Sequence, residues 1–349
     1  MKKKTLLTVA GLFILLQVAI IGCKPDPDFN ATPEETIAFK IPEGWPAAYY
    51  NFENNPLTKE GFELGRKLFF DGRLSRDNST SCGSCHQPFS AFAHLGHDVS
   101  HGIEDKLGTR NSPALFNLNW HTSFFWDGGV NHIEVQPLGP IQNPVEMDET
   151  LDNIIVKLNN DAEYKSMFKA AWGDETITSQ RMFKSLAQFM GMLISDNSKY
   201  DKYMRKEAGG EMTTEELAGL TVFREKCASC HKEPLFSDFS MRNNGLMPTA
   251  VNDSGRMRIT LDPADMRKFK VPSLRNLKYT PPYMHDGRFT TLDEVLTHYT
   301  SNIHQSPTLD PLLKNGIQLS ATEKTNLLAF LNTLNDEVFV KDERYKEVQ

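Results

Sequence analysis

The sequence predicts a mainly α-helical protein made of two similar halves that arose by duplication. Three observations predict this fold class. The pentapeptide Cys-x-x-Cys-His occurs once in each half, at residues 82–86 and 227–231. Apolar residues at helical spacing lead into each pentapeptide, over residues 58–70 and 213–227. The chain of 349 residues is long enough for two domains, each with its own core.

The N-terminus reads as a targeting segment over residues 1–22. Lys2–Lys4 precede a mostly apolar run from Leu6 to Ile21, and Cys23 follows. This order is typical of a bacterial lipoprotein signal, cleaved before Cys23 and then acylated on its thiol; a membrane anchor and an ordinary secretory signal are the alternatives. All three place the body outside the cytoplasm, and the first predicts a periplasmic or cell-envelope protein anchored by lipid. Residues 23–57 carry six prolines and are predicted to be a tether with little regular structure.

Helix signals recur in both halves. The patterns Thr213–Glu216 and Ser320–Glu323 are capping boxes that predict helix starts. Residues 150–205 read as further helices, and Gly209-Gly210 is the best candidate for the join between a first domain (58–208) and a second (209–349). The predicted buried positions are Phe62, Leu64, Leu68 and Phe69 in the first half, and Leu217, Leu220, Phe223, Leu327, Leu328, Leu331 and Leu334 in the second.

A second repeat supports the duplication. Trp126-Asp127-Gly128-Gly129 matches residues 285–288, which read His-Asp-Gly-Arg. A hydrophobic residue follows six positions after the aspartate in both copies, at Ile133 and Leu292. A shared period of this kind is the mark of a repeated structural unit.

The pentapeptides carry the chemistry. Cys-x-x-Cys-His is the attachment signature of a c-type haem, in which two thioethers hold the porphyrin and the histidine binds the iron. Paired zinc half-sites and redox dithiols are the alternatives, but zinc prefers four ligands in one site and a dithiol does not need the histidine. The formal net charge of −7 argues against a nucleic-acid partner. We therefore expect two haem c groups, on Cys82, Cys85 and His86 and on Cys227, Cys230 and His231.

Six further stretches, in order from about residue 58 to the C-terminus, carry a resemblance to one family. The chain resembles the bacterial di-haem cytochrome c peroxidases, which include MauG-like proteins. The resemblance implies two cytochrome c-like haem domains, of which the first reacts with hydrogen peroxide and the second transfers electrons. The matching stretches are 64–71, 110–113, 125–128, 139–147, 271–276 and 282–287.

The resemblance also implies roles for single residues. Glu146 matches the carboxylate that moves a proton from one peroxide oxygen to the departing one, and Gln136 matches the amide that holds peroxide. Trp126 matches an electron relay between the haems. Outside the family match, Glu146 would read as a surface glutamate and Trp126 as a core aromatic. The implied activity is a peroxidase that reduces hydrogen peroxide to water with electrons from a small c-type cytochrome or a blue-copper protein (cupredoxin).

The family match extends to a calcium site between the domains. Asn111, Thr280 and Pro282 occupy the matching positions, with an amide oxygen and two backbone carbonyls as ligands. Hard oxygen donors of this kind suit Ca²⁺. The resemblance leaves a homodimer open and gives the chain no membrane contact beyond the lipid anchor.

The sequence departs from the well-known peroxidases at both haems. Those peroxidases have a methionine at the position of Tyr299, whereas MauG, like this chain, has a tyrosine. Tyr299 therefore predicts His/Tyr ligation and a lowered potential at the second haem. His298 is the rival ligand. In those peroxidases a histidine binds the first haem iron in the resting state, and the matching position here is Ile103. We therefore expect a five-coordinate iron, with His101 as the rival sixth ligand. His94 and His97, in the same loop, are expected to be exposed to solvent.

Two other functions remain alternatives at this point. A MauG-like enzyme would oxidise residues of a partner protein, and Tyr299 favours it. A non-enzymatic di-haem electron carrier would not need the pair Gln136 and Glu146. A peroxide sensor would need an output segment, and the sequence shows none.

Overall fold

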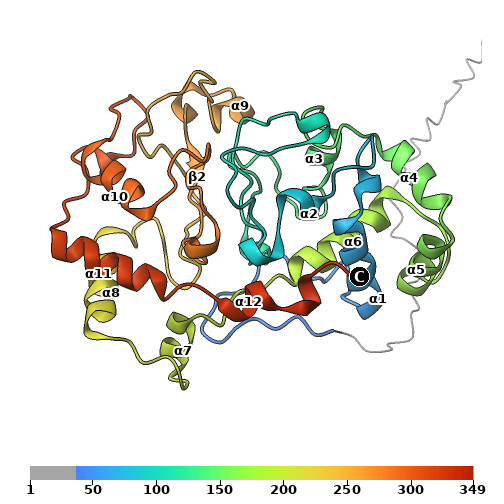
Figure 1. The fold of residues 1–349 in the computed structure, drawn as a ribbon, viewed down its shortest axis with the longest axis horizontal. Helices are drawn as coiled ribbons and strands as arrows, with labels where there is room; N and C mark the ends of the chain where they lie inside the picture. Colours follow the sequence, from blue (N-terminus) through green and yellow to red (C-terminus); the bar gives the residue numbers. More distant parts are fainter. Residues whose placement is uncertain (1–36, 349) are drawn as a thin grey trace, which may run out of the picture.

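The computed structural model describes residues 37–348, which form two helical halves lying side by side (Figure 1). The predicted signal segment and the predicted acylation site Cys23 lie outside the described residues. Within residues 37–348, no helix is both long enough and apolar enough to span a bilayer. Two strands of two residues each, β1 (Met241–Arg242) and β2 (Phe269–Lys270), pair antiparallel and are the named strands of this region.

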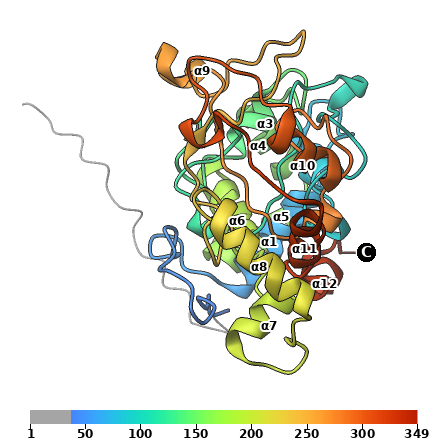
Figure 2. The same ribbon diagram turned by 90° about the vertical axis from the view of Figure 1, so that its left-hand side faces the viewer.

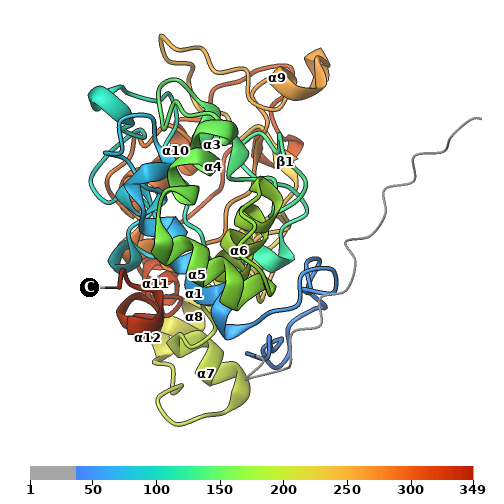
Figure 3. The ribbon, with the colours of Figure 1, turned by 90° about the vertical axis from the view of Figure 1, so that its right-hand side faces the viewer.

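The first half is organised around the contact between α1 and α6. Thr58 caps α1, and its side chain accepts a hydrogen bond from the Gly61 amide. A Cβ atom at Gly65 would fall 1.9 Å from the carbonyl oxygen of Ser185 in α6, so glycine permits the two helices to touch backbone to backbone. Figure 3 looks onto this half. Its helices are α1 (Lys59–Phe70), α2 (Cys82–Cys85), α3 (Leu138–Gln142), α4 (Leu151–Asn159), α5 (Ala162–Trp172), α6 (Ser179–Gly191) and α7 (Lys199–Arg205).

The second half repeats this construction with α8 and α11, which lie against each other in Figure 2. A Cβ atom at Gly219 would fall 1.9 Å from the carbonyl oxygen of Asn326, the same backbone contact as in the first half. The helices here are α8 (Thr214–Lys226), α9 (Met257–Thr260), α10 (Leu292–Ser301), α11 (Ala321–Asn332) and α12 (Glu337–Lys341).

Both predicted capping boxes are confirmed. Thr213 and Glu216 bond reciprocally at the start of α8, and Ser320 and Glu323 do so at the start of α11. Each such cap stabilises its helix by about 1 kcal/mol. The predicted burial of Leu217 is wrong, because this side chain is 40% exposed. The buried face of α8 includes Gly219, Val222 and Phe223, and is rotated away from Leu217.

The Asp-Gly repeat has the same backbone in both copies. An isolated bridge joins Phe124 to Val130 in the first copy and Tyr283 to Phe289 in the second. Gly128 and Gly287 both have φ near +66°, a conformation in which a side chain would be strained. The halves are therefore alike in these loops as well as in their paired helices.

The chain crosses between the two cores at both ends of the second half. Tyr200, before the predicted boundary at 208/209, packs in the second core with Phe223 and Phe330. Phe339 and Tyr345, at the end of the predicted second domain, pack in the first core. The predicted boundary therefore does not separate the cores: α7 contributes to the second, and the segment after α11 returns to the first, as Figure 1 shows for α12.

Residues 37–57 contain no helix or strand, as the proline content predicts, yet they pack against both halves. Trp45 stacks edge-on against Trp120, with 4.8 Å between ring centroids, and the Arg275 guanidinium lies 4.8 Å from the Trp45 ring. Phe52 is 5% exposed. The described part of the predicted tether is thus a strap along the junction of the two halves.

Candidate active site

A cavity of about 1130 Å³ lies between the two halves, and both pentapeptides line it. The residues that the sequence analysis selected from positions far apart in the chain are brought together here. Those that line the cavity are Cys82, Cys85, His86, His101, Asn111, Trp126, Gln136, Glu146, Cys227, Cys230, His231, Thr280, Pro282 and Tyr299.

The first pentapeptide forms the short helix α2, which Ser81 caps through a reciprocal bond with Ser84. The next residue, His86, places its Nδ1 atom 2.8 Å from the Phe92 carbonyl oxygen. Because a carbonyl can only accept, Nδ1 carries the proton and Nε2 is left with its lone pair for a metal. Burial lowers the pKa of His86 to about 4, which keeps the ring neutral. This is the state in which imidazole binds iron.

The second pentapeptide gives its histidine the same orientation. His231 Nδ1 lies 3.1 Å from the carbonyl oxygens of both Phe236 and Pro272, so Nε2 is again left free to bind. Burial lowers the pKa of His231, although the two carbonyls oppose the shift.

The cysteines fit haem attachment better than the alternatives. No disulfide joins these four cysteines, and burial raises the pKa of Cys82 and of Cys227 to about 12. A redox dithiol needs a lowered thiol pKa, which is the opposite. Within residues 37–348, no three His, Cys, Asp or Glu side chains are arranged to hold a metal ion, so the pentapeptides do not combine into a zinc site. The donor set and the cavity therefore fit two haem c groups.

Glu146 reaches the cavity from a turn after α3. Its amide donates to the Asn143 carbonyl over 2.9 Å, and its carbonyl accepts from the Ile103 amide over 2.8 Å. A Cβ atom at Gly102 would fall 2.4 Å from the Glu146 carbonyl oxygen, so glycine permits this close approach. Burial raises the pKa of Glu146, with a hydrogen bond from the Asn143 side chain opposing the shift.

Glu146 differs from the other acids of the cavity wall. Asp127 and Asp310 also line the cavity, but Arg110 and Arg242 pair with them at 2.6 Å and 2.8 Å. Among the described residues, no ion pair to Glu146 is present. A buried carboxyl with a raised pKa and no basic partner can both accept and return a proton.

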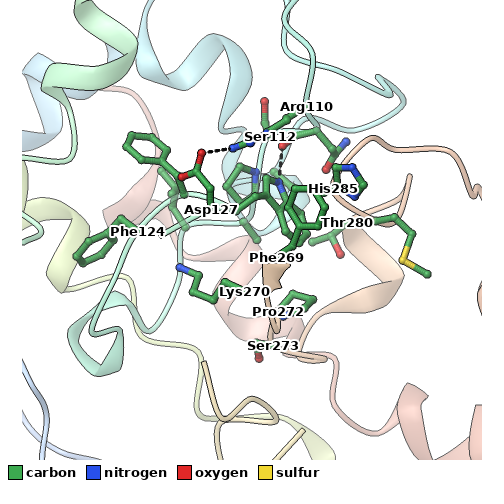
Figure 4. Close-up of a pocket in the computed structure, with 18 of the residues that line it drawn as sticks. Arg110, Ser112, Phe124, Asp127, Phe269, Lys270, Pro272, Ser273, Thr280 and His285 are labelled. Atoms are coloured by element: carbon green, nitrogen blue, oxygen red, sulfur yellow. Dashed lines mark hydrogen bonds and ion pairs between the residues drawn. The ribbon is translucent and has the colours of Figure 1, made fainter. Parts of the chain in front are cut away.

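Trp126 lies where the two halves meet. Its indole Nε1 donates to the Asn111 carbonyl over 2.9 Å, and its own carbonyl accepts from the Lys270 amide of β2 over 2.7 Å. Figure 4 shows the adjoining wall, with Arg110 bonded to Asp127 and with Lys270 below them. Contacts to both halves hold the indole at their junction.

The structure separates the two candidate ligands of the second haem. Tyr299 lines the cavity, and burial raises its pKa to about 12, with the Asn244 side chain opposing the shift. His298 is buried but is absent from the lining, and its Nε2 lies 3.0 Å from the Asn244 carbonyl oxygen. The geometry therefore favours Tyr299 over His298.

The histidine loop after the first pentapeptide differs in part from expectation. His101 lines the cavity, as a ligand candidate must. His94 was expected to be exposed and is not: it is 6% exposed, because its ring stacks on His97 with 3.9 Å between centroids. Ile103 is fully buried, and its amide donates to the Glu146 carbonyl. Its hydrocarbon side chain has no atom that could bind iron.

The residues selected for calcium lie on the same cavity wall. Asn111 Nδ2 donates to the carbonyls of His97 and Asp98, at 3.0 and 3.2 Å, which leaves Oδ1 available as an acceptor. Thr280 and Pro282 line the cavity with it, on the segment after the short helical turn Leu277–Tyr279.

Sequence reasoning missed three residues of this site: Asn143, Asn244 and Lys270. Asn143 shapes the turn that carries Glu146, and the Asn-Pro dipeptide at 143–144 is a turn signal that could have identified it. Asn244 reaches Met284 and Tyr299, which follow it in sequence by 40 and 55 residues. Neither Asn244 nor Lys270 belongs to a spaced motif, so only the folded chain reveals them.

Comparisons with known proteins identify relatives of this chain. The family model described as di-haem cytochrome c peroxidase matches residues 59–209. The methylamine utilization protein MauG of Methylophilus methylotrophus is 33% identical over 314 residues, covering 88% of this chain and 90% of that protein. Cytochrome c551 peroxidase of Nitrosomonas europaea is 32% identical, covering 80% and 81%.

A solved structure is similar as well. A MauG-like protein associated with microbial copper homeostasis superposes with a TM-score of 0.81 at 31% identity, covering 88% of this chain and 98% of that one. The relatives thus include peroxidases and MauG proteins alike. The chain belongs to the di-haem cytochrome c peroxidase family, and this membership implies two c-type haems.

Proposed function

We propose that this protein is a peroxidase that reduces hydrogen peroxide to water with two electrons from an external donor. The observation that carries the proposal is Glu146, the acid of the cavity wall without a basic partner, in the same cavity as the first pentapeptide. Gln136 lines this cavity too. The haem held by Cys82, Cys85 and His86 would supply a redox-active iron for peroxide, and the one held by Cys227, Cys230 and His231 would pass electrons to it.

The side chains account for the proton movement. The Glu146 carboxylate accepts a proton from one oxygen of hydrogen peroxide and delivers it to the other, which leaves as water. The Gln136 amide donates to and accepts from peroxide, and so holds it beside that carboxyl. Two electrons and two further protons complete the reduction to a second water. Trp126, bonded to both halves, would carry those electrons between them.

Steady-state turnover tests the proposal. Purified protein, hydrogen peroxide and a reduced small c-type cytochrome or blue-copper protein should give donor oxidation at two donors per peroxide. Donor oxidation no faster than in the protein-free control would contradict the proposal.

A MauG-like oxidase is the second candidate, because Tyr299 lines the cavity and the MauG of Methylophilus methylotrophus is 33% identical. Such an enzyme would take its electrons from residues of a partner protein. It predicts little turnover with small donors, together with a ferric EPR spectrum that reports His/Tyr ligation at one haem and a high-spin, five-coordinate iron at the other.

Three finer features belong to the same proposal. Calcium binds Asn111 Oδ1 and the carbonyls of Thr280 and Pro282. The mature chain is held at the periplasmic or cell-envelope side of a membrane by a lipid on Cys23. The two halves derive from one duplicated unit, which the paired glycine contacts and Asp-Gly loops support. Removal of calcium by a chelator, mass analysis of the mature N-terminus and the calcium content of purified protein test the first two.

A further inference from the structure

Lys270 is a basic residue of the cavity wall that the proposed reaction does not use. It ends β2 in the second half, and its ammonium reaches the loop that carries Trp126. Nζ donates to the Ser123 carbonyl over 2.6 Å and lies 3.3 Å from His121 Nδ1. Figure 4 shows this side chain extending towards Phe124, whose ring centroid is 5.8 Å from Nζ.

The polar partners of Lys270 are neutral, unlike those of Arg110 and Arg242 on the same wall. Arg110 pairs with Asp127 and Asp253, and Arg242 pairs with Asp238 and Asp310. Among residues 37–348, no ion pair to Lys270 is present. The carboxylate of Asp127 is close enough to act on Lys270, but Arg110 already bonds it at 2.6 Å.

A buried ammonium without an anion is costly, and burial accordingly lowers the pKa of Lys270 to about 7. A peptide carbonyl and an imidazole solvate the ammonium only in part. Lys270 nevertheless lines the cavity where both pentapeptides lie. A carboxylate that enters the cavity would complete the site.

We propose that Lys270 binds a propionate carboxylate of a porphyrin held in this cavity. The proposal depends on the two c-type haems that family membership implies, and not on peroxide turnover. The same residue bonds the Trp126 carbonyl through its own amide. Lys270 therefore links the acidic edge of a haem to the strand and loop that hold Trp126. Either haem could supply the carboxylate, and the test below distinguishes them.

The variants Lys270→Gln and Lys270→Arg separate charge from packing. Glutamine keeps a donor for the Ser123 carbonyl but removes the positive charge, and arginine keeps the charge. Redox titrations of each haem at several pH values, with resonance Raman bands of the propionate bending modes, provide readouts that do not involve activity. The haem content, measured by the pyridine haemochrome assay, serves as the check on assembly.

With two haems retained, Lys270→Gln should lower the midpoint potential of one haem, because a positive charge that stabilises the reduced iron is lost. The pH at which the midpoint potential of that haem changes should move upwards, since a carboxylate without its ammonium partner binds a proton more readily. The propionate band of that haem should shift, and Lys270→Arg should stay close to the wild type. The haem whose potential moves is the one that Lys270 binds.

Unchanged potentials and propionate bands in Lys270→Gln would overturn the proposal and leave Lys270 as a clamp on the Trp126 loop. Equal shifts in the Gln and Arg variants would do the same, because they would report packing and not charge. Lys270→Met carries the identical test if the Gln variant fails to accumulate.

Discussion

Glu146→Gln is the most direct test of the chemistry assigned to the cavity. The substitution keeps the size of the side chain and its ability to accept a hydrogen bond, and it removes the proton that the carboxyl would carry. The structure sets the magnitude. Of the three acids that line the cavity, Asp127 and Asp310 are held by Arg110 and Arg242, so neither can replace Glu146. The loss should therefore approach the full effect of a general acid–base, about 10²–10⁴-fold in kcat/KM.

The pH profile gives the same residue a second test. A base must be ionised, so kcat/KM should fall as the pH drops through the pKa of Glu146. Burial raises that pKa above its ordinary value, which moves the acid limb to higher pH than a solvent-exposed glutamate would give. The limb should disappear in Glu146→Gln.

Glu149→Gln is the matched control. Glu149 is also buried, at 4% exposed, but it pairs with Lys157 at 2.6 Å and does not line the cavity. Its loss should lower the stability of the fold and leave kcat/KM within a few-fold of wild type. Haem content and peroxide turnover are measured on all three proteins. Turnover by Glu146→Gln within a few-fold of wild type, at equal haem content, would refute the assignment of Glu146.

Three further substitutions test the fold and the second haem. Asp201→Asn should lower the free energy of unfolding by about 3–5 kcal/mol, because the Arg275 guanidinium loses its bidentate partner. The Arg275 side chain is 0% exposed, so water cannot replace that partner. A thermal melt unchanged from wild type would contradict this. Gly65→Ala should lower the free energy of unfolding by about 1–3 kcal/mol, because the added Cβ would fall 1.9 Å from the Ser185 carbonyl oxygen. Denaturant unfolding measures this change. An unchanged free energy of unfolding would mean that α1 and α6 can separate freely. Tyr299→Phe should raise the midpoint potential of one haem, since a phenolate ligand stabilises ferric iron; identical redox titrations would exclude Tyr299 as a ligand.

Local sequence signals predicted the elements that depend on neighbouring residues. The capping residues at Thr213 and Ser320 fix where α8 and α11 begin, because a side-chain oxygen meets an amide three residues on. Leu217 was misjudged, since the rotation of α8 is set by the contact of Gly219 with Asn326 of α11, 107 residues away in sequence. A single boundary does not separate the two cores for the same reason: Phe339 returns to the first core, which no local pattern announces.

The sequence by itself predicted the cofactor chemistry of this protein. Thioether attachment and iron ligation need two cysteines and a histidine at fixed short spacing, so residues 82–86 and 227–231 could be read directly. Only the tertiary structure decided which lone side chains share the cavity with them. Glu146, Tyr299 and Lys270 come from segments far apart in sequence, and their environment depends on burial and on which charges are already paired. Those properties arise from the packing of the two halves, which no stretch of sequence contains.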